Sequence, residues 1–240
     1  MAEFIEDVKN GPLHSAYAKD APFDKGKNAL EAGGYRIISL EENAKLRIQE
    51  GKNALVSQNG NWTREGVLYI PKKGIFLTKK SSIMEEAEEA TDCHRKGKEF
   101  CLNSKQVEKS LHGAVKLPGD SIPTDRFEEN EVTNYAFGKT AKAYGEFLKD
   151  AGIIAMPISL ASLGNKPYAR QMWFGYLGFR SELNGDDVNL DYYDVARGVR
   201  EVKAGEASTK NLYSREQISQ ALKETNLSGI EKTLLEKLSK

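Results

Sequence analysis

The 240-residue sequence predicts an α+β domain, and the order of its elements carries the prediction. Two regions typical of strands flank a central region of two helices and a loop, whereas a parallel α/β sheet would need strict alternation of strands and helices. A hydrophobic content of 39% and a charged content of 29% are ordinary for a globular protein and argue against disorder. A chain of this length buries a sizeable core without disulfides or metals.

The first regular element is predicted by a helix-capping signal. Residues 1–28 are expected to be irregular, because glycine and proline interrupt any long element there. Residues 35–40 are typical of a short strand. Ser39 then caps a helix that runs to about residue 49, and Glu42, three residues later, completes the capping box.

Short strands in hairpins are expected next, and each is bounded by turn residues. The expected strands are residues 54–57, 67–70 and 75–78, with turns at 59–61 and 71–74. The two main helices are then expected at 82–96 and 133–149, separated by a loop at 118–130. Acidic residues open the first of these helices and basic residues close it, which matches the helix dipole. An apolar run at 153–158 predicts a buried strand.

The sequence predicts one domain over residues 1–205 and a helical tail over residues 206–240. Residues 204–209 are typical of a linker. Two capping boxes, Ser214 with Gln217 and Ser228 with Glu231, predict two short amphipathic helices in the tail.

Charge and hydropathy exclude several classes of function. The chain carries 35 basic and 35 acidic residues, so no net field favours binding to nucleic acid or to an anionic membrane. Its apolar runs are too short to span a bilayer, and its first residues lack the basic and apolar regions of a signal peptide. The expected location is therefore cytoplasmic by default, with display at a surface left open.

Residues that could bind a cofactor or support catalysis are sparse. Cys93 and Cys101 have no metal-ligand spacing, and they are expected to be ordinary thiols, although pairing or a zinc site with the nearby histidines is conceivable. The three histidines, His14, His94 and His112, are scattered, and no phosphate loop or nucleophile elbow is present. The sequence therefore predicts a protein that is not an enzyme and has no metal or cofactor.

The stretch from residue 167 to residue 202 differs in composition from the rest of the chain. Lysine is about one residue in ten overall, yet none occurs between Lys166 and Lys203. Tyrosine, phenylalanine, aspartate, asparagine and glycine are abundant there instead. This mixture is typical of antibody-like binding surfaces, where rigid aromatic rings bury area and short polar groups adapt to a partner. A turn-rich pair of strands is the alternative, since asparagine, aspartate and glycine also mark turns.

Specific residues in this stretch resemble the variable proteins of archaeal diversity-generating retroelements. The resemblance rests on Ala169-Arg-Gln-Met-Trp173, Leu177, Arg180-Ser181, Leu183, Gly185, Leu190 and Ala196-Arg-Gly-Val-Arg200, and similar stretches extend it over most of the chain up to about Val202. The resemblance implies a C-type lectin-like fold of the formylglycine-generating-enzyme type, with two main helices and short antiparallel sheets.

The resemblance also implies a hypervariable region at about residues 169–200, rewritten at adenine positions of the gene by a reverse transcriptase. An asparagine codon rewritten in this way never encodes Lys, Glu, Gln, Met or Trp. The positions expected to be diversified, and to bind the ligand, are Tyr176, Gly178, Phe179, Asn184, Asp186, Asp187, Val188, Asn189, Asp191, Tyr192, Tyr193, Asp194 and Val195. All of them belong to the permitted set, whereas Met172, Trp173 and Glu182 do not and are expected to be framework.

The resemblance assigns structural roles to the framework. Trp173, Leu177, Leu183 and Leu190 are expected to anchor the displayed surface to the core. Four arginines, at 170, 180, 197 and 200, are expected to bind carboxylates or carbonyl oxygens, with an anion site as the alternative.

Two functions from different classes follow. The first is a display protein whose diversified surface binds variable targets, expected to be proteins or cell-surface macromolecules, with the oligomeric state open. The second is a fixed-function member of the same fold, sugar-binding or enzyme-like. Aspartates in the variable stretch suggest calcium, but the motifs of calcium-dependent lectins are absent.

Overall fold

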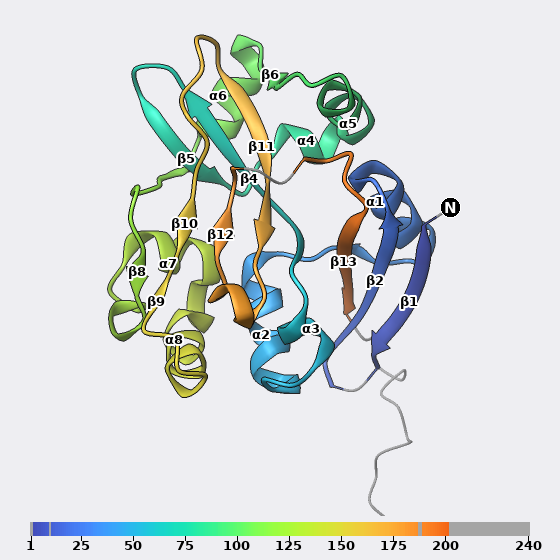
Figure 1. The fold of residues 1–240 in the computed structure, drawn as a ribbon, viewed down its shortest axis with the longest axis vertical. Coiled ribbons are helices and arrows are strands. Elements are labelled where there is room, and N and C mark those ends of the chain that lie inside the picture. The colour runs from blue at the N-terminus through green and yellow to red at the C-terminus, as the bar shows by residue number, and fades with distance from the viewer. Residues whose placement is uncertain (1, 10, 187–188, 202–240) are drawn as a thin grey trace, which may run out of the picture. The chain divides into compact units, whose positions relative to one another are not determined.

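A mixed sheet organises the chain and includes both its first and its last described strands (Figure 1). The computed structural model describes residues 2–9, 11–186 and 189–201. Within these residues eleven strands form one sheet, whose main path runs β1-β2-β13-β4-β11-β12-β10. Most neighbours are antiparallel, and the pairs β10 with β12 and β13 with β4 are parallel. The predicted helical tail, residues 206–240, lies outside the described residues.

The strands and helices alternate irregularly along the chain, as the α+β prediction requires. In order they are β1 Glu3–Val8, β2 Leu13–Ala21, α1 Phe23–Ala32, β3 Arg36–Ile37, α2 Leu40–Glu50, α3 Leu55–Gln58, β4 Asn61–Ile70, β5 Gly74–Thr78, α4 Ser82–Glu85, α5 Ala87–Arg95, β6 Phe100–Cys101, α6 Ser104–Leu111, β7 Val115–Lys116, β8 Ile122–Pro123, η1 Thr124–Arg126, α7 Glu131–Phe137, η2 Gly138–Thr140, α8 Ala141–Asp150, β9 Ala155–Met156, β10 Ile158–Ser159, β11 Tyr168–Phe174, η3 Leu177–Phe179, β12 Leu183–Asn184 and β13 Asp194–Glu201.

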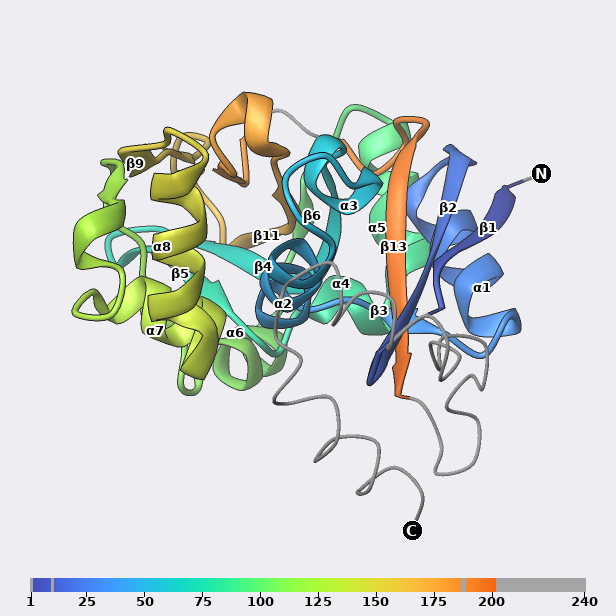
Figure 2. The ribbon, with the colours of Figure 1, turned by 90° about the horizontal axis from the view of Figure 1, so that it is seen from below.

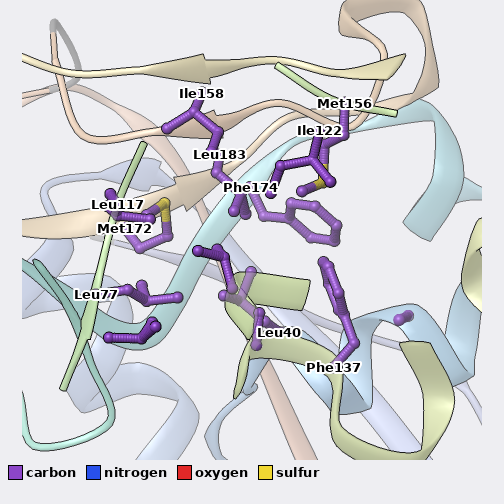
Figure 3. Packing of buried hydrophobic residues seen from close by; sticks show 14 of the residues in the cluster. Leu40, Leu77, Leu117, Ile122, Phe137, Met156, Ile158, Met172, Phe174 and Leu183 are labelled. Carbon is purple, nitrogen blue, oxygen red and sulfur yellow. The ribbon is translucent and has the colours of Figure 1, made fainter. Parts of the chain in front are cut away.

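Strands β4 and β11 are buried on both faces. Successive side chains of a strand point to opposite sides, so each strand contributes to two cores. Val67 and Tyr69 of β4 enter a core covered by α2, α7 and α8. Leu68 and Ile70 of the same strand enter a second core covered by α1, α4 and α5. Figure 3 shows the first core, where Phe174 at the end of β11 lies close to Phe137 of α7.

The helix-capping prediction is confirmed in detail. Ser39 caps α2 by accepting a hydrogen bond from the Glu42 amide at 3.2 Å, and the Glu42 carboxylate accepts one from the Ser39 amide at 2.9 Å. Burial raises the pKa of Glu42, but hydrogen bonds from Arg36 and Ser39 outweigh it and lower that pKa to about 2. The strands expected around 67–70 and 75–78 are also present, in β4 and β5.

The expectation of an irregular opening segment was wrong. Gly11, at a φ of 85°, forms the turn between β1 and β2, and Pro22 is the N-cap residue of α1. Both residues therefore bound regular elements instead of preventing them, since proline is tolerated where a helix begins. The strand expected at 54–57 was also wrong, because α3 occupies most of it.

Both main helices are interrupted in the structure. The first breaks at Glu86, which has a φ of −123° and separates α4 from α5. The second breaks at Gly138, which has a φ of 53°, so that the 3₁₀ turn η2 separates α7 from α8. The apolar run at 153–158 forms two short strands, β9 and β10, and Ile154 between α8 and β9 is 85% exposed.

Buried Glu65 links β4 to the start of α2. Its side chain is fully buried, and Oε2 accepts a hydrogen bond from the Leu40 amide at 3.0 Å. Oε1 has no hydrogen-bond partner among the described residues, and its closest cation is Arg64 at 3.9 Å. Burial raises the pKa of Glu65 to about 7.

The protonated carboxyl of Glu65 should therefore increase the free energy of unfolding at low pH. A carboxyl whose pKa is raised in the folded state favours folding below its ordinary value of 4.5, and this contribution is lost as pH rises through about 7. Glu65→Gln keeps an oxygen for Leu40 and removes the charge. Urea unfolding should find the variant more stable than the parent by roughly 3 kcal/mol at about pH 8, and similar to it near pH 4. Exposed Glu146→Gln is the matched control, and the same gain in both variants would contradict the assignment.

Candidate ligand-binding surface

The predicted variable stretch runs from the end of β11, through η3 and β12, to the start of β13. In Figure 2 the orange turn η3 and the orange-red segment that leads into β13 both lie toward the upper edge of the view, and Figure 1 shows them apart, beyond opposite ends of β12. The two segments project from strands that the central sheet holds, since β11 pairs with β4 and β13 pairs with β2. Loops on a rigid sheet are a common site for binding residues.

Arg47 of α2 holds the η3 loop in place through hydrogen bonds. Its side chain is fully buried, and Nη1 donates hydrogen bonds to the Gly175 carbonyl at 2.9 Å and to Ser181 Oγ at 3.0 Å. The guanidinium carbon lies 4.1 Å from the centroid of the Phe174 ring. Burial lowers the pKa of Arg47, and its counterparts are carbonyl and hydroxyl oxygens instead of a carboxylate. The loop backbone therefore depends on a residue outside the variable stretch.

The η3 loop closes through two consecutive residues in the left-handed region. Arg180 and Ser181 have φ values of 53° and 55°, which cost energy in residues with a side chain. Ser181 is compensated, because its buried Oγ accepts hydrogen bonds from Arg47 and from Tyr144 at 2.9 Å. Arg180 is exposed, and its backbone amide donates to the Leu177 carbonyl at 2.8 Å.

The tip of the η3 loop presents aromatic rings. Tyr176 and Phe179 pack edge to face, with centroids 4.8 Å apart and an interplanar angle of 79°. Phe179 is 55% exposed, and Tyr176 is half-buried. A Cβ at Gly178 would lie 2.3 Å from the Tyr176 ring, so a side chain there requires that ring to move. Two expected diversified positions are thus coupled to each other.

Leu190 anchors the segment between β12 and β13. Its side chain is fully buried in the core that contains α1 and α5. Its carbonyl accepts a hydrogen bond from the Phe23 amide at 2.8 Å, and its amide donates to Nδ1 of His94 at 3.0 Å. His94 is 7% exposed, and burial lowers its pKa, which favours the neutral ring that this hydrogen bond needs. Tyr192 and Tyr193, just beyond the anchor, are 50% and 75% exposed.

Strand β12 fixes the middle of the stretch. Leu183 is fully buried, and the Gly185 carbonyl accepts a hydrogen bond from Tyr69 Oη at 2.8 Å. A Cβ at Gly185 would lie 2.9 Å from both Tyr69 and Val67, so only glycine fits without rearrangement.

The thirteen expected ligand-binding positions differ in exposure. Gly178, Phe179, Tyr192 and Tyr193 are exposed. The half-buried positions are Tyr176, Asp186, Asn189, Asp191, Asp194 and Val195. Asn184 is only 8% exposed and accepts a hydrogen bond from the Asp186 amide at 2.8 Å, so its side chain supports the loop. Asp187 and Val188 lie outside the described residues.

The residues expected to be framework contact the scaffold. Met172 is fully buried, Trp173 packs against the α1 side of the sheet, and Glu182 accepts a hydrogen bond from Ser159. Leu177 is partly buried and packs against the first core.

Arg170 and Arg197 bind carboxylates as expected. Arg170 pairs with Glu99, and buried Arg197 pairs with Asp7 at 2.6 Å. Arg200 lies over the Tyr35 ring at 5.5 Å.

The remaining polar candidates do not assemble into a metal site. Within the described part of the chain, no three His, Cys, Asp or Glu side chains gather closely enough to hold a metal ion. Asp194 is largely buried, which raises its pKa. Cys93 is half-buried and Cys101 is exposed, and both are free thiols. No helix in residues 2–9, 11–186 and 189–201 combines the length and apolar character of a membrane span.

Sequence reasoning missed Arg47 and His94, although each has a local signal. Arg47 follows Leu40 and Ala44 at the spacing of one helix face, and both of those residues are buried. His94 follows Ala87 and Ala90 in the same way. A polar residue in register with a buried face is a candidate for an internal hydrogen-bonding role.

Comparison with known proteins identifies the fold class. The chain has an α+β fold of the C-type lectin type. It is similar to a solved structure described as showing the accommodation of massive sequence variation in Nanoarchaeota by the C-type lectin fold, with a TM-score of 0.55 and 14% sequence identity. The match covers 84% of this chain and 98% of the other. No family model matches the sequence, and no curated protein matches it.

Replacing Arg47 should destabilise the η3 loop more than a surface change on the same helix. Arg47→Met removes the donor to Gly175 and Ser181 and leaves buried acceptors unpaired, which costs about 2–4 kcal/mol. Urea unfolding should show this loss, and amide exchange should show faster exchange at residues 175–181. Exposed Lys45→Met on α2 is the control, and an Arg47 variant as stable as this control would refute the role.

Gly60, in the turn before β4, should tolerate no side chain. A Cβ there would lie 2.0 Å from the half-buried Trp173 ring, so Gly60→Ala should displace the ring and cost about 1–3 kcal/mol. Gly119→Ala is the control, because nothing lies within 4 Å of a Cβ at that position. Equal melting temperatures for the two variants would show that Trp173 is not fixed.

Proposed function

We propose that this chain is a ligand-binding display protein whose exposed loop residues are diversified by a retroelement. The observation that carries the proposal is that, within residues 174–195, exposed side chains and the contacts that hold the backbone involve different residues. Exposed aromatic residues such as Phe179, Tyr192 and Tyr193 lie on a backbone that buried residues outside the stretch hold in place. Such a scaffold accepts changes at its tips while the core is unchanged.

The chemistry of the exposed residues favours a macromolecular target. Tyrosine and phenylalanine bury large area with few rotatable bonds, as antibody-like surfaces do. No lysine, whose ordering costs most entropy, occurs from residue 167 to residue 202. The proposed partner is a protein or another macromolecule at a cell surface, and the proposed activity is binding, not catalysis.

The codon restriction is consistent with the proposal. Each of the thirteen expected positions carries a residue that a rewritten asparagine codon can encode. Met172, Trp173 and Glu182, which such a codon cannot encode, make internal contacts. The solved structure of similar fold also concerns sequence variation. We extend that property to this chain as part of the proposal.

A matched pair of display libraries tests the proposal. The first places NNC codons, which encode the permitted residues, at the thirteen expected positions. The second places them at buried framework positions of the same stretch, namely Met172, Phe174, Leu183, Gly185, Leu190 and Ala196. Most clones of the first library should be displayed in folded form, as a conformation-sensitive antibody against the scaffold reports, and most clones of the second should not. The first library should also yield binders to unrelated proteins.

Two outcomes would count against the proposal. Equal loss of folded protein in both libraries would mean that the thirteen expected positions are not free to vary. A first library that folds but never yields binders would favour the fixed-function alternative. In the genome, differences between near-duplicate genes should fall at template adenines within the codons for these positions.

A further inference from the structure

The segment between β12 and β13 is attached to α5 by a hydrogen bond whose acceptor can be protonated. Over residues 189–193, the Leu190 amide donates to Nδ1 of His94 at 3.0 Å. Figure 1 shows this orange-red segment passing beside α5 and α1 before it enters β13. A neutral imidazole accepts through Nδ1 only when its proton is on Nε2, and a protonated imidazole accepts through neither nitrogen. The charge of the His94 ring therefore decides whether the Leu190 amide has its partner.

His94 is enclosed while the segment is in place. Its side chain is buried, and Nε2 has no hydrogen-bond partner among the described residues. Water can then do little to hydrate a positive charge on the ring, and burial lowers the pKa of His94. Opening of the segment exposes the ring and returns its pKa toward the ordinary value of 6.5. A proton therefore binds the open state more tightly than the closed state.

Charged groups face His94 from three parts of the chain. Burial is the largest influence on its pKa; Glu99, before β6, and Asp191, within the segment, raise that pKa, whereas Arg170 of β11 lowers it, and the net shift is downward. Arg170 and Glu99 also pair with each other, which offsets the charge that either presents to the ring. Charged groups on α5 itself, and on α1 and α4, which pack against it, form ion pairs of their own. These pairs are Asp92 with Arg95 on α5, Asp24 with Lys25 on α1, and Glu85 of α4 with Lys109 of α6.

From this geometry we propose that His94 is a pH-sensitive switch: its neutral ring holds residues 189–193 against the scaffold, and protonation of the ring releases them. The Leu190 carbonyl accepts a hydrogen bond from the Phe23 amide at 2.8 Å, so both backbone contacts of Leu190 are expected to open together. The buried Leu190 side chain limits how often the segment opens at neutral pH, and protonation of His94 shifts that equilibrium.

The switch would act on one part of the proposed binding surface. Tyr192 and Tyr193 are exposed on the released segment, whereas Phe179 is exposed on the η3 loop, which Arg47 holds. A ligand that contacts the two tyrosines should therefore be released at acidic pH, and this consequence rests on the proposed function. The opening itself belongs to the unliganded chain, so it can be tested whether or not the chain binds a target.

Closure of the segment should weaken as pH falls. The contribution of the neutral ring is complete above pH 6.5, and below it the opening equilibrium rises by up to about tenfold per pH unit, until the lowered pKa of the closed state is reached. Amide exchange of the unliganded chain measures this equilibrium once the intrinsic pH dependence of exchange is removed. Between about pH 7.5 and about pH 5.5, the Leu190 and Phe23 amides should become about tenfold less protected. Residues 175–181, which Arg47 holds, should keep their protection.

Two substitutions of His94 separate the hydrogen bond from its titration. His94→Asn supplies an amide oxygen close to the position of Nδ1, which accepts a hydrogen bond but does not titrate, so the pH effect should disappear. His94→Leu supplies no acceptor, so the Leu190 amide should already be about tenfold less protected at about pH 7.5. His112→Asn, at an exposed histidine, is the matched control and should keep the pH dependence of the parent chain.

The ring signals of the parent chain give a readout that needs no variant. Two-bond ¹H–¹⁵N spectra should show the Nε2–H tautomer of His94 at about pH 7.5 and a pKa below 6.5. Three results would each overturn the inference: the Nδ1–H tautomer at that pH, protection of Leu190 that is the same at both pH values, or an undiminished pH effect in His94→Asn.

Discussion

The buried guanidinium of Arg47 is the interaction on which the proposed binding surface depends. A charged group inside a protein is stable only when hydrogen bonds replace the water it has lost. Here Val56, Gly175, Ser181 and Tyr144 supply acceptors for Nε and Nη1, at distances of 2.9–3.1 Å, whereas Nη2 has no partner among the described residues. A carboxylate partner would have fixed the arginine to one side chain. Because one of its acceptors is the Gly175 carbonyl, Arg47 also holds the backbone at the start of the η3 loop.

In the segment between β12 and β13, too, the contacts that hold the backbone do not involve the exposed side chains. Leu190 is held through its own amide and carbonyl, by His94 and Phe23, and its side chain fills the core. Neither contact uses the side chains of Tyr192 or Tyr193. Coupling between positions is still present within a loop, as the close approach of Gly178 to the Tyr176 ring shows. Diversification at one position would therefore restrict its immediate neighbour more than the distant loop.

Local signals made part of this fold predictable. Ser39 and Glu42 satisfy each other's backbone groups within four residues, so the start of α2 follows from the sequence alone. Residues 54–57 contain no such signal, because a run of three apolar residues fits a strand or a helix equally well, and α3 forms there. The break at Glu86 lies between α4 and α5, which pack against different neighbours, and no glycine or proline marks it in the sequence. Within the site, composition identified the exposed aromatics, whereas buried Asn184 and the supports from α2 and α5 depend on contacts far apart in sequence.

The placement of β13 has a consequence for how the protein folds. This strand inserts between β2 and β4, so that Glu201 pairs with Leu13 and Ala196 pairs with Trp62. Contacts between such distant residues form slowly, because the intervening chain loses conformational entropy before the new contacts compensate for that loss. During synthesis the sheet stays open until the ribosome has released β13, at the end of the expected variable stretch. Under the proposed diversification, a variant whose loops delay β13 would expose the edges of β2 and β4 to aggregation before it could bind a target.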